Sequence, residues 1–224
     1  MHVIRGVLIP VAAVSCLLLT GCSEGKADKD NAGAEPSVIG SPVGKPIASP
    51  PATAPEDDEN EGVPAPEAGA PFVEYVKEEL RKRTVRMAHA PGKTSATCDK
   101  DTVKPVRDAT ITCTVTYEGL KVVWPVRFTG KPGFGGMGDG YEARPSTGLL
   151  TRAGVHRYWW GNHRNEDGGG DMRCDSMPRV WKAPLGQKTK YRCTYFAPKA
   201  SVTGADMWIT DSIVATEDGP RGQS

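Results

Sequence analysis

A strict alternation of apolar and polar side chains over residues 110–128 constrains the fold of this chain more than any other feature. From 110 to 117 the odd-numbered residues are apolar or cysteine and the even-numbered residues are all threonine. Glu118-Gly119 fits a two-residue turn, and apolar residues recur at every second position from Leu120 to Phe128. The pattern predicts a β-hairpin whose apolar residues share one side. Its facing pairs would be Tyr117 with Leu120, Val115 with Val122, Cys113 with Trp124 and Ile111 with Val126.

Pro125 limits how this hairpin can extend. It falls opposite Thr112, in a pair that exchanges no backbone hydrogen bonds, so its missing N–H would point away from the partner strand. Proline is confined to such positions in sheets. We therefore predict an edge strand or an interrupted ladder at Pro125.

An amphipathic helix is predicted before the hairpin. Pro71 suits the first helical position, and Pro91-Gly92 ends the pattern. Acidic residues come early and basic residues late, as the helix dipole favours. Two favourable pairs lie four apart, Glu78 with Lys82 and Glu79 with Arg83. The apolar stripe consists of Val73, Val76, Leu80, Thr84 and Met87, widened by Phe72 and Tyr75.

A second, looser version of the pattern follows. Cys174-Asp175 repeats Cys98-Asp99, and the segments around Cys193 and Cys113 are also alike. An apolar strand at Met207–Val214 takes the place of Leu120–Phe128, but Tyr141–Asn162 is not a clean amphipathic helix, so a second copy would be degenerate at its front. We predict an α+β fold, a helix packed on antiparallel hairpins, in two related disulfide-stapled units. The expected boundaries are 71–130 for the first unit, 131–140 for a Gly-rich link, 141–218 for the second unit and 219–224 for a tail.

The first predicted unit resembles a known family. The order of helix, cysteine, polar spacer and Thr-Ile-Thr-Cys-Thr-Val-Thr-Tyr-Glu-Gly with a second strand is similar to a small domain of secreted proteins and lipoproteins of Gram-positive bacteria, domain of unknown function 4333. The resemblance covers about residues 71–130 and implies that Cys98 pairs with Cys113. Asp99 departs from the family, in which proline commonly follows the first cysteine. The family has no assigned function, so the resemblance implies no activity.

The N-terminal third has the opposite composition. Residues 23–70 contain no aromatic residue, eight prolines and six glycines, whereas all 15 aromatic residues lie in 71–224. Such a segment buries too little apolar area to offset its ordering entropy, so 22–70 is predicted to be a disordered tether. Residues 23–70 carry a net charge of −7 and residues 71–224 one of +7. The basic part would be attracted to anionic polymers, although both charges also fit ordinary solvated surfaces.

Leu19-Thr20-Gly21-Cys22 closes an apolar stretch behind Arg5 and resembles the lipobox of a bacterial lipoprotein signal peptide. The resemblance implies removal of residues 1–21 and diacylation of Cys22. The 13-residue apolar run Val7–Leu19 is too short for a membrane span, which takes about 20 residues. A simple secretory signal usually has an Ala-x-Ala pattern instead. We expect lipid anchoring at the extracytoplasmic face of the bacterial cell membrane.

Four further cysteines remain, an even number that predicts disulfides in an exported chain. Three connectivities are possible, and the spacings favour the local ones. A zinc site usually has cysteines or histidines two to four apart, and no such pair occurs. The favoured pairs are Cys98 with Cys113 and Cys174 with Cys193.

The sequence gives only weak evidence for a catalytic or metal-binding site. His156, His163 and the acidic stretch 165–171 form the nearest approach to a reactive cluster, but the stretch lacks calcium-loop spacing and the chain has no hydrolase motif. His89 is expected at the end of the first helix. Tyr158-Trp159-Trp160 is the better candidate for binding, because adjacent residues on one strand point to opposite faces and at least one ring would be exposed. The predicted binding residues are Arg157, Tyr158, Trp159, Trp160 and Arg164.

Two functional hypotheses result. The first is a non-enzymatic, membrane-anchored lipoprotein that binds a wall polymer or an envelope protein and needs no cofactor, metal or nucleic acid. The second is a wall-modifying enzyme or accessory that uses His156, His163 and the acidic turn.

Overall fold

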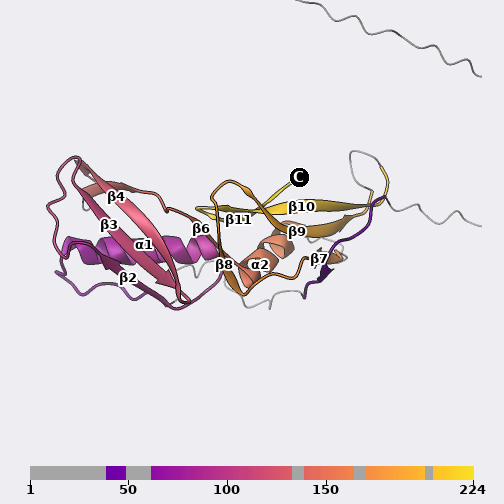
Figure 1. The fold of residues 1–224 in the computed structure, drawn as a ribbon, viewed down its shortest axis with the longest axis horizontal. Coiled ribbons are helices and arrows are strands. Elements are labelled where there is room, and N and C mark those ends of the chain that lie inside the picture. Colours follow the sequence, from indigo (N-terminus) through magenta and orange to yellow (C-terminus); the bar gives the residue numbers. More distant parts are fainter. Residues whose placement is uncertain (1–38, 49–61, 133–138, 164–169, 200–203) are drawn as a thin grey trace, which may run out of the picture. The chain divides into compact units, whose positions relative to one another are not determined.

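The computed structural model describes residues 39–48, 62–132, 139–163, 170–199 and 204–224. These residues form two α-helices and three antiparallel sheets, the predicted α+β class (Figure 1). The strand pairs within the sheets are all antiparallel.

We name helix α1 and the four-stranded sheet that follows it in the sequence the first unit. The sheet has the order β2-β3-β4-β5, and its apolar face forms one core with the helix. All four predicted facing pairs of the hairpin are confirmed. The elements are α1 (Phe72–Ala88), β2 (Thr94–Cys98), β3 (Thr110–Tyr117), β4 (Leu120–Pro132) and β5 (Asp139–Ala143).

The prediction for Pro125 is also confirmed. Pairing of β4 with β5 starts at Val126, so Pro125 lies just outside that ladder. The residues 131–140, which we predicted to link the two units, instead contain the end of β4 and the start of β5, two strands of the same sheet. Glycine content therefore indicated a connection but not which elements it connects.

Helix α1 buries the five main residues of the predicted stripe, whereas Tyr75 is exposed. The helix ends at Ala88, followed by His89 in the left-handed conformation (φ 51°). The pair of Lys82 and Glu78 forms at 2.7 Å. Arg83 instead pairs with Glu217, which lies between β10 and β11, at 3.1 Å.

The second unit has the same arrangement as the first. Its helix is followed by four strands that pair in the order β7-β9-β10-β11. The intervening β8 (Val180–Ala183) pairs with β6 (Gly148–Thr151) outside this sheet. The agreement of element order and sheet order supports an internal duplication. The elements of the second unit are α2 (Arg152–His163), β7 (Met172–Cys174), β9 (Lys188–Ala197), β10 (Met207–Thr216) and β11 (Gly219–Gln223).

Two features of the second unit differ from the sequence prediction. Helix α2 occupies the region in which no clean helix was recognised, and its first turn is capped by Thr151, whose Oγ1 accepts a hydrogen bond from the Gly154 N–H at 2.8 Å. The same hydroxyl donates to the Ala88 carbonyl at the end of α1 at 2.9 Å. The residues 219–224, predicted as a tail, contain β11, which covers the edge of β10.

Both predicted disulfides are present, and they have equivalent surroundings. Cys98–Cys113 and Cys174–Cys193 each join residues directly opposite on neighbouring strands. The Asp175 N–H donates to the Arg192 carbonyl and the Arg192 N–H donates to the Asp175 carboxylate, both at 2.9 Å. Asp99 and Thr112 exchange the same two hydrogen bonds beside the first disulfide, at 3.0 Å.

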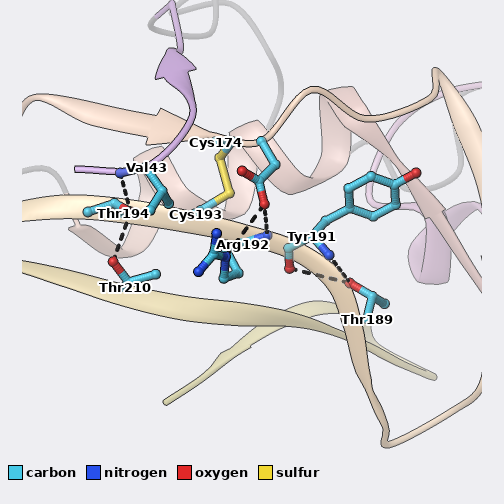
Figure 2. Close-up of a disulfide and its surroundings, with 9 residues drawn as sticks. Val43, Cys174, Thr189, Tyr191, Arg192, Cys193, Thr194 and Thr210 are labelled. Carbon is cyan, nitrogen blue, oxygen red and sulfur yellow. Dashed lines mark hydrogen bonds and ion pairs between the residues drawn. A yellow bond between two sulfur atoms is a disulfide. The ribbon is translucent and has the colours of Figure 1, made fainter. Parts of the chain in front are cut away.

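Residues 39–48, which we name the strap, depart from the predicted tether. Ile39 pairs with Met207 of β10, and β1 (Lys45–Pro46) pairs with β7, so the strap crosses β9. At this crossing the Val43 N–H donates to Thr194 Oγ1 at 3.3 Å, and that hydroxyl also bonds Thr210 (Figure 2). Gly44 has a positive φ of 73°, and a Cβ there would overlap the backbone of Cys174.

Residues 62–70 also depart from the tether prediction, because Val63 is buried in the core of the first unit. Average composition does not reveal ordered segments such as the strap and residues 62–70. A few residues of a polar segment can pack one side chain into a core, or form one hydrogen bond to a sheet, that other parts of the chain build. The rest of the predicted tether, 22–38 and 49–61, lies outside the described residues, as does the signal segment.

Candidate functional site

The predicted aromatic binding residues lie on α2 and not on a strand. The argument that adjacent rings point to opposite faces therefore does not apply, since successive residues turn around a helix. Trp159 is fully buried, with 0% exposure, in the core of the second unit. Tyr158, Trp160 and Arg157 are half-buried. Arg164 lies outside the described residues.

A local signal for α2 was present in the sequence. Thr151 is a good N-cap residue, and Val155 and Trp159 lie four apart on the buried side. The aromatic, glycine and asparagine residues of this segment are weak helix formers, which concealed the signal.

Four side chains of the second unit converge beside α2, and we name them the histidine cluster: Tyr158 and His163 on α2, Tyr195 on β9, and Asp211 on β10. The Tyr195 ring stacks on the imidazole of His163, with centroids 3.9 Å apart and an angle of 15° between the planes. The Tyr158 ring lies 6.5 Å from the imidazole in an edge-on arrangement. One helix and two strands thus contribute to one polar group.

Burial changes the protonation chemistry of this cluster. Asp211 is 8% exposed, and burial raises the pKa of its carboxyl group, an effect that nearby His163 partly offsets. Burial lowers the pKa of His163, against the opposing field of Asp211. The pKa of Tyr195 is raised by burial and by the charges of Asp211 and Tyr158. The buried Nε2 of His163 has no hydrogen-bond partner among the described residues.

The first unit shows which residues occupy the positions equivalent to Asp211 and Tyr195. Trp124 faces Cys113 in the first unit, and Asp211 faces Cys193 in the second, so Asp211 takes the place of a fully buried tryptophan. Tyr195, two residues after Cys193, likewise takes the place of the buried Val115. The fold is therefore compatible with apolar residues at both positions. Burying a carboxylate there costs stability, and such costs concentrate at functional sites.

The histidine cluster combines aromatic faces with a buried carboxylate. Arg221, an exposed residue of β11, places its guanidinium 5.9 Å from the centroid of the Tyr158 ring. Aromatic faces together with an anion can bind an organic cation or a planar ring. Sequence reasoning identified Tyr158 and His163 but missed Tyr195 and Asp211, and the internal alignment on Cys193 is the signal that would have found them.

The residues of the alternative, catalytic hypothesis are only partly brought together. His156 is half-buried, and burial and Arg152 lower its pKa. Of the acidic stretch, Asp171 forms an ion pair with Arg173 at 3.0 Å, whereas 165–169 lie outside the described residues. In the part of the chain that the structure describes, no three His, Cys, Asp or Glu side chains are grouped as metal ligands.

Comparison of this chain with protein-family models, with curated proteins and with solved structures finds no match. The resemblance of residues 71–130 to a lipoprotein domain stays a prediction. The two disulfides indicate an extracytoplasmic compartment. Neither helix in the described ranges is long and apolar enough to cross a membrane.

Proposed function

We propose that this chain is a lipoprotein, anchored through Cys22 at the extracytoplasmic face of a bacterial membrane, which binds a wall polymer or an envelope protein without catalysing a reaction. The lipobox pattern supports the anchor, and the disulfides are consistent with an exported protein. The binding site is the histidine cluster together with Arg221.

The observation that supports this site is the replacement of Trp124 by Asp211 at equivalent positions of two units with the same fold. Burying a carboxylate costs stability even with His163 nearby, so the presence of Asp211 is explained better by a ligand than by folding. The partly exposed rings of Tyr158 and Tyr195 are of the type enriched at binding hot spots.

Photo-crosslinking in intact cells tests the proposal. A photoreactive phenylalanine analogue replaces Tyr158 in the full chain, and a control chain carries it at Val123, an exposed residue of β4 in the first unit. We expect a specific adduct from position 158 and none from position 123. Identical adducts from both positions, or no adduct at position 158 in a correctly folded protein, would contradict the proposed site.

One observation favours the catalytic alternative, namely the electrostatic coupling of His163 and Asp211, a pairing also found in acid–base catalysis. A metal-dependent enzyme would be stabilised by its metal, because a ligand that binds only the folded state raises the thermal midpoint. Titration of the full chain with zinc and with calcium separates the two hypotheses. A rise of the midpoint that is lost in His163→Gln would favour the enzyme.

A further inference from the structure

The first strands of the two units differ in what lies along their outer edges. In the second unit, β1 of the strap pairs with the outer edge of β7. In the first unit, the equivalent strand β2 pairs with β3, and its other edge pairs with no strand in the described ranges.

The disulfides fix which backbone groups point outward. The joined cysteines have Cα atoms only 4.0 Å and 4.1 Å apart, the spacing of pairs that exchange no backbone hydrogen bonds. Such pairs alternate along a ladder, so Ala96, two residues before Cys98, belongs to the same class. Its N–H and C=O therefore point away from β3, toward the outer edge of β2.

Met172 is the equivalent of Ala96 in the second unit, and its outward carbonyl is used. It accepts a hydrogen bond from the Ile47 N–H of the strap at 2.9 Å. Neither outward backbone group of Ala96 has a hydrogen-bond partner within the described part of the chain.

A solvent-open hollow of about 300 Å³ lies beside this unpaired edge. Ala96 forms one wall, and α1 and residues 64–67 form the others. Pro64 and Pro66 have no N–H to donate, and no ladder joins this neighbouring segment to β2 in the described residues. The charged residues that line the hollow are Glu67, Glu74, Lys77, Glu78 and Arg81, a net charge of −1.

We propose that the outer edge of β2 binds an extended segment of a partner protein, added as a short antiparallel strand with a basic side chain. The strap provides the precedent, since Lys45 and its neighbours make this addition on the equivalent edge of the second unit. Glu74 and Glu78 already form ion pairs with Lys77 and Lys82, so a basic residue of the bound segment would pair with Glu67. Backbone hydrogen bonds would supply most of the affinity, as in other strand-addition complexes. This site is separate from the histidine cluster.

A synthetic peptide with the strap sequence Ser-Pro-Val-Gly-Lys-Pro-Ile-Ala is the probe, used with the full chain. At saturating peptide we expect amide hydrogen exchange at Ala96 to slow at least tenfold, while exchange at Met172 and Cys174 stays unchanged. A peptide with glutamate in place of lysine should bind at least several-fold more weakly. Absence of binding, or protection only at β7, would overturn the proposal.

Two variants of one residue sharpen the test. Ala96→Pro removes the outward N–H and keeps the β2–β3 hydrogen bonds of Ser95 and Thr97, whereas Ala96→Ser keeps every backbone donor. We expect the proline variant to lose at least tenfold in peptide affinity and the serine variant to bind like the wild type. Equal affinities of two folded variants would reject the site. If the proline variant does not fold, peptides that each carry one N-methylated backbone amide are tested against the wild-type chain instead. Methylation removes one N–H donor of the peptide, so at least one of these peptides must lose binding, and unchanged binding of all of them would reject the site.

Discussion

Gly154 lies where the start of α2 meets the end of α1. A Cβ at this position would overlap the carbonyl oxygen of Ala88 and approach Thr151 Oγ1. Glycine is therefore needed here for close approach, although glycine inside a helix normally lowers stability.

We predict that Gly154→Ala destabilises the fold by about 1–3 kcal/mol, the usual cost of overpacking. Gly161→Ala on the same helix is the matched control, because a Cβ there meets no atom within 4 Å. The control should be neutral or stabilising by up to about 1 kcal/mol. Urea unfolding at neutral pH measures both, and equal effects of the two substitutions would contradict the close approach.

Asp211 should show a trade-off between stability and binding. Asp211→Leu replaces a buried carboxylate by an apolar side chain at a position that is apolar in the first unit, so we expect a higher thermal midpoint. The same change should abolish the crosslink from position 158. A lower midpoint would show that Asp211 supports the fold, and an unchanged crosslink would remove it from the site.

The lowered pKa of His163 predicts a dependence of stability on pH. The unfolded chain, with a histidine pKa near 6.5, binds the proton more readily than the folded chain, so stability falls as pH drops below about 6.5. His156 acts in the same direction, whereas Asp211, whose pKa is raised, opposes the loss once it is protonated. Thermal midpoints between pH 7.5 and 5.5 should decrease less steeply for His163→Gln than for the wild type. Parallel slopes would refute the assignment to His163.

At the scale of elements, the two disulfides differ in accessibility. Cys98 is half-exposed, whereas the three other paired cysteines are buried. Thiol exchange requires access to a sulfur atom. Mild reduction of the native protein should therefore open Cys98–Cys113 before Cys174–Cys193. Peptide mapping after alkylation measures the order, and the reverse order would contradict it.

The elements with strong periodicity were predictable and those held by other elements were not. The hairpin pattern specified its register because one face is buried, and α1 has both an apolar stripe and favourable end charges. Helix α2 was missed because its stripe contains only Val155 and Trp159 among weak helix formers. The strap was missed because its hydrogen bonds go to β7, β9 and β10, which only the folded chain brings near it.

The candidate site was partly predictable for a similar reason. Tyr158 and His163 lie close together in the sequence, whereas Tyr195 and Asp211 are brought together by the pairing of β9 with β10. The packing of His163 on Tyr195 joins the two pairs. A lone aspartate in an apolar strand suggests nothing by itself. It becomes informative when its equivalent in the first unit is known to be Trp124.

At the scale of the whole molecule, the proposed lipid anchor would determine where the protein is found. Cys22→Ser should move the protein from the membrane fraction to the medium or leave the precursor uncleaved, since a stable anchor requires two acyl chains. Fractionation and the apparent mass of the protein measure this. Normal membrane association of a normally processed Cys22→Ser variant would refute the lipid anchor.

The strap lies within the segment that was predicted to be a tether. Sixteen residues lie between Cys22 and Ile39, the first described residue of the strap, whereas the predicted tether 23–70 has 48 residues.

The same attachment decides how a mechanical load would travel through the protein. With Cys22 held in the membrane and a ligand bound at the histidine cluster, tension enters at Ile39 and passes through the strap into β10 and β7. The pulling force therefore acts within the second unit, and the first unit carries none of it while the strap holds. The hydrogen bonds of the strap to β7, β9 and β10 would therefore bear such a load before the first unit does.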